Sequence, residues 1–291
     1  MIYVQTNNQS NIQGVAFDAA AEKINGEPFW ITQGDREVTR AELSPDGTRF
    51  VMRVIRRTQD DLVTVSRDGS DWRDITNDAP FDRYVRWSPD GKQITFTSDR
   101  SGSTEVWTGN SDGTNLQQIT FINSPDNGAG FPVWSPDGKR ICYTTRESQS
   151  FIIDLTKNPG ERTPQPIGLS EKVTGFVTWD WSPDGKKLGG TIYEGNDRFL
   201  GFYSFETNSF TKLAETNDFI PSWLPDSRHI VYGKDNKIVI TDTITGKTIE
   251  LVTSPNKQLR SPFVSRDEKL LYYSAHTNES DIWLLDNSQN P

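Results

Sequence analysis

The sequence predicts an all-β fold, a β-propeller built from four-stranded antiparallel blades. The first observation behind this prediction is the hexapeptide Trp-Ser-Pro-Asp-Gly-Lys, which occurs three times; with three weaker copies, the serine-equivalent positions fall at 44, 88, 135, 182, 224 and 265. The second is that short segments of alternating apolar and polar residues lie between the copies and are bounded by turn residues. A repeat every 41 to 47 residues is typical of an architecture in which each copy is one structural unit.

Composition is consistent with one propeller domain over residues 1–291. The repeats occupy nearly the whole chain, and although only 33% of the residues are hydrophobic, 9 Trp, 15 Phe and 8 Tyr supply large side chains. Few apolar residues in alternation with polar ones are what half-buried strands require. No apolar run approaches the roughly 18 residues that span a bilayer, and the first residues are neither basic nor long enough for a signal peptide. We therefore expect no direct membrane insertion.

The amino-terminal segment decides the expected blade number. The second and third strands of the repeat occur seven times, beginning with Ile2 to Thr6 and Asn11 to Asp18, whereas the first and last strands occur six times each. The final repeat lacks an outer strand, which Pro28 to Thr32 could supply, so that both ends of the chain join one sheet. We therefore prefer six blades, with Ile2 to Asp18 as extra edge structure. Seven blades, with incomplete first and last sheets, is the alternative.

The second repeat is the template for each blade. It predicts strands at Arg83 to Ser88, Gln93 to Thr97, Thr104 to Gly109 and Leu116 to Thr120. In the turn after the first strand, proline presets φ, aspartate bonds the backbone two residues on, and glycine takes the positive φ that closes the reversal. The repeated aspartates are therefore interpreted as turn formers, and the large apolar residue before each serine as packing between blades.

Charge and side-chain inventory exclude several functions. Forty acidic and 31 basic residues give a net charge of -9, which disfavours nucleic acid as a partner. One cysteine, Cys142, excludes an internal disulfide, and two histidines, His229 and His276, cannot build a multi-histidine metal centre. We therefore expect no cofactor. Calcium is the ion that the composition leaves open, because the acidic turn Asp68 to Asp71, or Asp82 with Asp126, offers carboxylate ligands.

The repeats resemble a known family. Trp-Ser-Pro-Asp-Gly-Lys, the segment Thr97 to Gly102 and the Ile-Thr strand ends at 75–76 and 119–120 resemble the WD-repeat-like blades of the TolB-type bacterial propellers, over about 90% of the chain. The resemblance implies a bacterial propeller that is often periplasmic or otherwise extracytoplasmic and serves as a protein-binding platform. The chain lacks the separate amino-terminal α/β domain of TolB proper, which puts membership of the Tol system in doubt. A shorter segment, Asn11 to Asp18 with Asn25 to Pro28, looks like the propellers of bacterial transmembrane regulators and kinases, which implies a sensor or scaffold module of a longer protein.

The loops that join one blade to the next are the expected binding site. The longest, Phe121 to Phe131, exceeds a tight turn, and long loops tend to carry function. Aromatic and arginine side chains near the same rim could form an interaction hot spot. The channel-mouth candidates are Phe81, Arg83, Tyr84, Asp126, Phe131, Phe176, Trp179, Phe219 and Arg260.

The sequence favours a non-enzymatic scaffold or sensor that binds a protein, a peptide or a small ligand, and we expect a monomer. No Gly-x-Ser-x-Gly motif of a serine hydrolase occurs, and no catalytic residue is predicted. The alternative is a propeller hydrolase or lyase acting on a sugar or lactone. That function requires a channel-bound divalent ion or a pair of buried carboxylates at the channel.

Overall fold

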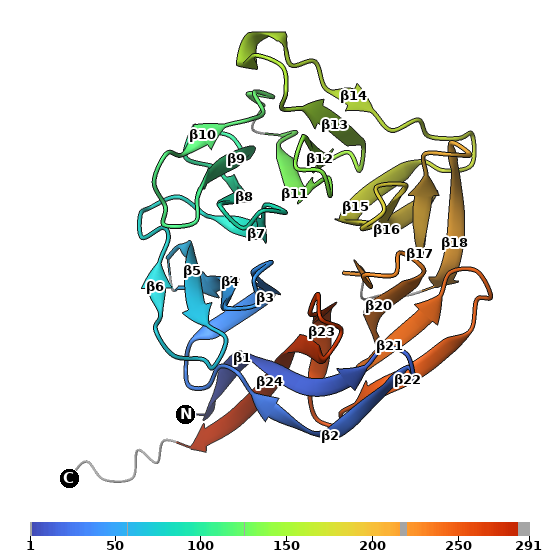
Figure 1. The fold of residues 1–291 in the computed structure, drawn as a ribbon. Helices are drawn as coiled ribbons and strands as arrows, with labels where there is room; N and C mark the ends of the chain where they lie inside the picture. The colour runs from blue at the N-terminus through green and yellow to red at the C-terminus, as the bar shows by residue number, and fades with distance from the viewer. Residues whose placement is uncertain (1, 57, 125, 216–219, 285–291) are drawn as a thin grey trace.

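The computed structural model describes residues 2–56, 58–124, 126–215 and 220–284. These residues form six four-stranded antiparallel sheets, which are arranged radially about a common centre (Figure 1). The predicted six-bladed propeller is confirmed.

Five blades are continuous in sequence and run from the inner strand to the outer strand. The strands of the first two blades are β3 (Glu37–Leu43), β4 (Arg49–Ile55), β5 (Asp60–Ser66) and β6 (Arg73–Asp74), then β7 (Arg83–Trp87), β8 (Gln93–Ser98), β9 (Glu105–Asn110) and β10 (Gln117–Gln118). Those of the third are β11 (Ala129–Trp134), β12 (Arg140–Thr145), β13 (Ser150–Asp154) and β14 (Gln165–Pro166), with the short 3-10 helix η1 (Pro159–Glu161) before the last. The fourth and fifth contain β15 (Gly175–Trp181), β16 (Lys187–Glu194), β17 (Asp197–Ser204) and β18 (Ser209–Glu215), then β19 (Ser222–Trp223), β20 (His229–Lys234), β21 (Lys237–Asp242) and β22 (Thr248–Thr253).

The sixth blade joins the two ends of the chain. Its strands, from the centre outward, are β23 (Gln258–Val264), β24 (Leu270–Leu284), β1 (Ile2–Asp18) and β2 (Lys23–Trp30). The amino-terminal segment thus supplies two strands of this blade (Figure 1). The prediction that this segment closes the ring is confirmed, and the interpretation of residues 2–18 as extra edge structure is wrong.

The reason is the length of the pairing between β1 and β24. These strands pair continuously from Ile2 with Leu284 to Ala16 with Leu270. Because β1 occupies the outer edge of β24, residues 281–284 continue β24 and do not begin the separate third strand that alternation predicts at Asp281 to Leu285, and β2 takes the outermost position. Leu285 lies outside the described residues. Each sheet thereby keeps four strands without a seventh blade.

The hexapeptide forms the turn between the two innermost strands, as predicted. In the second copy the Ser88 hydroxyl donates to the Asp90 carboxylate at 2.7 Å, and the amide of Lys92 donates to the same carboxylate oxygen at 3.1 Å. Gly91 has φ +71°, which a residue with a side chain rarely adopts. In the fifth copy Leu224 replaces the serine, and Asp226 instead accepts from the amides of Arg228 and His229.

Hydrophobic clusters occupy the six interfaces between adjacent blades in the described structure. Trp87, for example, packs with Val51 and Leu62 of the preceding blade. Trp134, Trp181 and Trp223 occupy the matching place in later interfaces. The residue before each repeated serine therefore serves blade packing, as predicted.

Candidate functional site

The inner strands of all six blades face a central channel. Between Thr39 and Glu42, and again between Arg83 and Arg86, the pairing with the second strand shifts register, as in a β-bulge. A bulge redirects side chains. The position two residues before each repeated serine then lines the channel, and its occupants are Glu42, Arg86, Val133, Asp180, Ser222 and Phe263.

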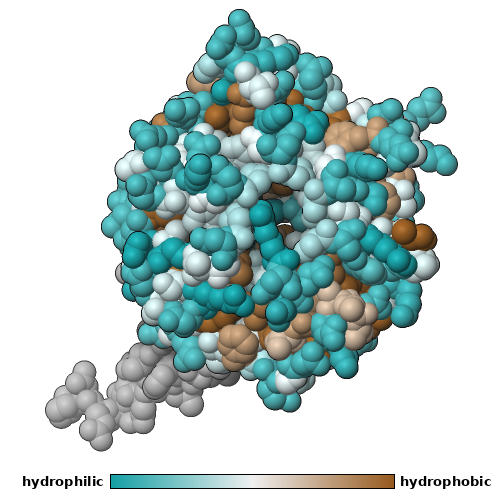
Figure 2. All heavy atoms as spheres, in the orientation of Figure 1, coloured by the Kyte–Doolittle hydropathy of each residue, from teal (hydrophilic) through white to brown (hydrophobic). Residues whose placement is uncertain are grey.

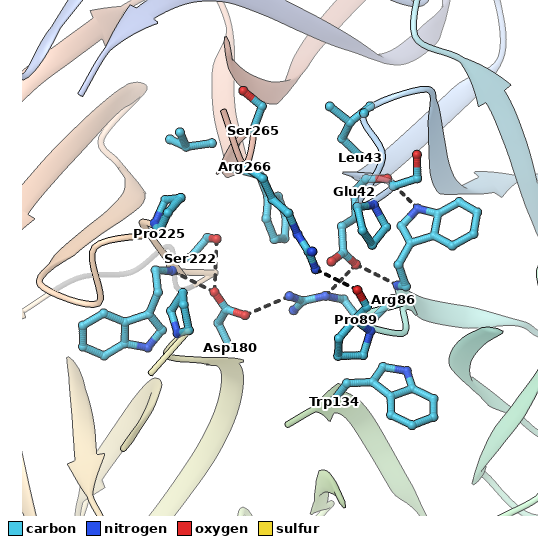
Figure 3. Close-up of a pocket in the computed structure, with 18 of the residues that line it drawn as sticks. Glu42, Leu43, Arg86, Pro89, Trp134, Asp180, Ser222, Pro225, Ser265 and Arg266 are labelled. Carbon is cyan, nitrogen blue, oxygen red and sulfur yellow. Dashed lines mark hydrogen bonds and ion pairs between the residues drawn. The ribbon is translucent and has the colours of Figure 1, made fainter. Parts of the chain in front are cut away.

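These six residues lie at the base of a cavity, which we call the channel pocket. It has a volume of about 750 Å³ and opens at the face that carries the hexapeptide turns (Figure 3). Its walls contain the indole rings and the turn prolines of successive blades, namely Trp87, Trp134, Trp181, Trp223, Pro45, Pro89, Pro136, Pro183 and Pro225. The volume lies within the range of roughly 300–1,000 Å³ that small-molecule sites show.

An arginine and two carboxylates from three blades form the base of the channel pocket. The guanidinium of Arg86 donates from Nε to Glu42 at 2.8 Å and from one Nη to Asp180 at 2.8 Å (Figure 3). Its other Nη donates to the backbone carbonyl of Trp179 at 2.8 Å. The ring of Phe263 lies 5.2 Å from the guanidinium carbon. This network ties blades 1, 2 and 4 together across the channel.

The two carboxylates differ in how many of their oxygens are occupied. Asp180 uses one oxygen for Arg86 and the other for the Ser222 hydroxyl and the Trp223 amide, at 3.1 and 2.7 Å. Glu42 uses Oε2 for both Arg86 and the Trp87 amide. Among the described residues, none donates a hydrogen bond to its Oε1. Burial raises the pKa of Glu42, and the positive charge of Arg86 lowers it; the effect of burial is the larger of the two.

The rim of the channel pocket is polar. Arg266, in the hexapeptide turn of blade 6, donates to the carbonyl of Pro89 in the hexapeptide turn of blade 2 at 3.3 Å. Its side chain therefore reaches across the opening of the channel pocket (Figure 3). In the space-filling view the surface is hollowed near the centre of the ring, and most residues around the hollow are hydrophilic (Figure 2). A ligand would therefore enter through a polar rim onto walls of proline and indole.

Three of the predicted site residues meet at the other end of the channel, where the blade-connecting loops lie. The ring of Phe131 lies 4.4 Å from that of Tyr84 and 4.7 Å from that of Trp179. Arg40 contacts the same group, with its guanidinium carbon 4.8 Å from the Tyr84 ring and 4.9 Å from the Trp179 ring. We call these four residues the loop-side cluster.

The remaining predicted site residues are spread more widely. Phe81 is exposed and lies 5.0 Å from the guanidinium carbon of Arg83, which binds Asp60. Asp126 and Arg260 are exposed, and Arg260 lies close enough to affect the pKa of His276. Phe219 lies outside the residues that the structure describes.

Phe176 does not reach the rim where we expected it. It is fully buried between blades 3 and 4, with its ring 5.1 Å from that of Phe210. The absence of a side chain at Gly190 makes room for it, because a Cβ there would lie 2.7 Å from the Phe176 ring. Phe176 therefore serves packing.

Sequence reasoning missed Glu42, Arg86, Asp180 and Arg40. The available signal was their fixed spacing from the repeated serine, two residues before it for the first three and four residues before it for Arg40. Position alone could not reveal the ion pairs, because the partners lie 44 and 94 residues apart and meet only when the ring closes.

Other reactive side chains lie away from the channel pocket. Cys142 is buried, and burial raises the pKa of its thiol to about 12. His229 contacts Asp226 and Glu22, so it links the fifth blade to the turn between β1 and β2. His276 faces Arg260 at the loop side. None of these groups lines the channel pocket.

Comparison with known proteins relates this geometry to a family. Residues 30–165 match the family model described as the TolB beta propeller domain, PD40. This part of the chain contains TolB-type β-propeller repeats. The fold matches a putative TolB from Agrobacterium tumefaciens with a TM-score of 0.71 and 16% identity, covering 92% of this chain and 98% of that one.

Two further structures indicate the range of functions that share this fold. TolB from Acinetobacter baumannii matches with a TM-score of 0.66 and 15% identity over 93% of this chain, which spans 65% of that protein. An oligogalacturonate lyase from Vibrio parahaemolyticus matches with a TM-score of 0.55 and 10% identity, over 94% of this chain and 98% of that one. Both a TolB and an enzyme therefore share the architecture of this TolB-like propeller, and the architecture does not choose between them.

Within the described ranges, no helix of this TolB-like propeller has the length and hydropathy needed to cross a bilayer.

Proposed function

We propose that this TolB-like propeller is a non-enzymatic bacterial scaffold that takes a segment of a partner protein into the channel pocket. The observation that carries the proposal is the base of that pocket. Arg86 holds both carboxylates there, and Asp180 has no oxygen left for a reaction. A site built in this way can hold a ligand but has few groups free to transfer a proton.

The residues in the walls of the channel pocket favour a peptide as the ligand. Indole and proline rings offer rigid apolar surfaces that lose little conformational entropy on binding, and tryptophan is enriched in interaction hot spots. At the base, Oε1 of Glu42 is an acceptor without a donor among the described residues. A backbone N–H or a hydroxyl of the inserted segment would satisfy it.

The resemblance to TolB supports an extracytoplasmic location, which we include in the proposal. Fractionation of a bacterium that expresses the full-length natural protein tests it: recovery in the periplasmic or membrane-associated extracytoplasmic fraction is expected, and recovery with cytoplasmic markers would contradict it.

Site-specific photo-cross-linking tests the binding function. Benzoylphenylalanine replaces Pro136 at the rim of the channel pocket in one variant and Gly160 on the outer edge in the control. We expect a discrete cross-linked protein from position 136 that position 160 does not produce. Cross-links of the same species from both positions, or from neither, would remove the support for this pocket as the binding site.

A second function, a hydrolase or lyase acting on a sugar, is favoured by one observation. Two carboxylates lie at the channel, buried Asp180 and partly buried Glu42, and desolvation raises the pKa of Glu42, as a general acid requires. The test is incubation with oligogalacturonate, with and without manganese, for the wild type and Glu42→Gln. Product formation by the wild type that the variant loses would establish the enzyme; no product from either protein would leave the scaffold as the function.

A further inference from the structure

Arg40 is the most unusual charged side chain of the loop-side cluster. It is only 9% exposed and lies beside the rings of Tyr84 and Trp179, with guanidinium-to-ring distances of 4.8 and 4.9 Å. Aromatic faces attract a cation but do not neutralise it. Burial lowers the pKa of Arg40 to about 10, so it still carries its charge at neutral pH.

The guanidinium of Arg40 has no hydrogen bond or ion pair in the part of the chain that the structure describes, and Nη1 is completely enclosed without an acceptor. Buried arginines are normally paired, because an unpaired buried charge is costly. The nearest acid on the same strand is Glu42, whose Oε2 binds Arg86. An anionic group is therefore missing at this position.

The backbone holds this side chain in the channel at a cost. Arg40 has φ +56°, and the equivalent residues Tyr84 and Phe131 have +57° and +55°. Glycine adopts such angles without strain, whereas bulky residues there cost about 1–3 kcal/mol each. Strained positions with large side chains tend to mark functional sites, and three of them here supply the loop-side cluster.

The charges around the cluster also favour an anion. Arg53 and Arg83 both bind the same carboxylate oxygen of Asp60, at 2.7 and 2.5 Å. Arg53 also lies close enough to Arg40 for its charge to lower the pKa of Arg40. Asp60 is thus already shared by two guanidinium groups, whereas the guanidinium of Arg40 has no carboxylate partner in the described structure.

We propose that the loop-side mouth of the channel binds a carboxylate, presented by an acidic side chain or the free C-terminus of a peptide, on Arg40 beside Tyr84 and Trp179. Arg40 keeps 9% of its surface exposed, and the ring of Phe131 contacts both of the other rings. The site lies on the loop side of the pocket base, where the Trp179 carbonyl accepts from Arg86, and it uses none of the pocket walls on which the proposed scaffold function rests.

The test uses four acetylated tripeptides. Ac-Ala-Ala-Leu carries a free C-terminus and its amide is neutral; Ac-Ala-Glu-Ala-amide carries a side-chain carboxylate and its Gln counterpart is neutral. The readout is the indole N–H resonance of Trp179, which donates to Thr191 at 2.9 Å and is assigned by its loss in Trp179→Phe. We expect saturable shifts with at least one carboxylate peptide and none with the neutral ones, and the peptide that binds identifies the source of the carboxylate.

Arg40→Met removes the charge and keeps a side chain that fits an aromatic environment. We expect it to weaken binding about tenfold or more, as the loss of a charge-assisted hydrogen bond does. The matched control is Arg49→Met, which removes a charge at the opposite end of the same blade, where Arg49 binds Asp71. We expect the control to bind as the wild type does.

Three results would overturn the proposal: no saturable shift with either carboxylate peptide, equal shifts with the neutral peptides, or unchanged affinity in Arg40→Met. If that variant does not fold, Arg40→Lys decides. It keeps the charge but loses the planar fork, so we expect a folded protein with weaker binding. Wild-type affinity in Arg40→Lys would then exclude Arg40 as the specific contact.

Discussion

At the scale of single residues, the ion pairs of Arg86 explain how one side chain joins three blades. Arg86 is 8% exposed and bonds Glu42, Asp180 and the Trp179 carbonyl. The opposing carboxylates outweigh burial and raise the pKa of Arg86. The arginine is therefore charged at neutral pH, and its removal would leave the carboxylates of Glu42 and Asp180, which are 17% and 11% exposed, without an opposing charge.

We expect Arg86→Met to lower the free energy of unfolding by about 3–5 kcal/mol, because uncompensated buried charges remain. Urea denaturation measures the loss. Arg49→Met is the control, since the Arg49 and Asp71 side chains are 20% and 44% exposed and such a pair contributes about 1 kcal/mol or less. Equal losses in the two variants would show that the network at the pocket base has no special role in stability.

The pH dependence of stability has a residue-level source in His276. Burial, assisted by the charge of Arg260, lowers the pKa of His276 from 6.5 to about 4. Between these two values the unfolded chain binds a proton that the folded protein does not, so stability falls as the pH is lowered from 6.5 to about 4.

We expect the wild type to lose about 1–2 kcal/mol over that interval through His276, allowing for the partial exposure of its ring. In His276→Gln this part of the loss should disappear. Urea denaturation at a series of pH values measures both proteins. Parallel curves for the two proteins would contradict the assignment.

At the scale of elements, the repeated turn explains why the blades share one shape. In the third copy the Ser135 hydroxyl and the Lys139 amide donate to Asp137 at 2.5 and 3.1 Å, as in the second copy. These bonds, that of Ser135 foremost, lower the pKa of Asp137. The carboxylate therefore stabilises the fold above the ordinary aspartate pKa, and this contribution is lost as the pH falls through the folded value.

Asp137→Asn should therefore lower the melting temperature by a few degrees at pH 7, and the difference from the wild type should vanish at acidic pH, where both side chains are neutral. Calorimetry at pH 7 and at pH 3 and below provides the measurement. Asp126→Asn, in an exposed loop, is the matched control and should change neither value. A pH-independent difference for Asp137→Asn would mean that shape, and not charge, matters in this turn.

At the scale of the whole molecule, stability depends on the closure of the ring. Ile12 lies in the cluster between blades 6 and 1, and Val15 and Phe17 lie in the cluster between blades 5 and 6. The amino-terminal strands therefore complete two of the six interfaces. Without them the sixth blade would keep only β23 and β24.

We expect deletion of residues 1–32 to abolish the cooperative unfolding transition, as followed by circular dichroism. Deletion of residues 1–8 alone is the control, because this part of β1 pairs only with residues 278–284 of β24 and leaves the rest of the sheet in place. A synthetic peptide of residues 9–32 added to the longer deletion should restore the transition. Cooperative unfolding of the 1–32 deletion without the peptide would show that five blades and the β23–β24 hairpin are sufficient for a cooperative fold.

The sequence by itself determined the fold, because each repeat carries its own turn residues and its own alternation, and these act over a few residues. It also determined closure by the amino-terminal segment, through the unequal count of strands. Only the tertiary structure decided which strands fill the sixth blade, since that depends on the pairing of β1 with β24 across the whole chain.

The candidate sites were likewise decided partly by the sequence and partly by the tertiary structure. Tyr84, Phe131 and Trp179 could be predicted as aromatic residues near a channel mouth. The ion pairs of Arg86 with Glu42 and Asp180 could not, because only ring closure brings these side chains within bonding distance. For the same reason the sequence could not show that Arg40 packs against aromatic rings without an acidic partner.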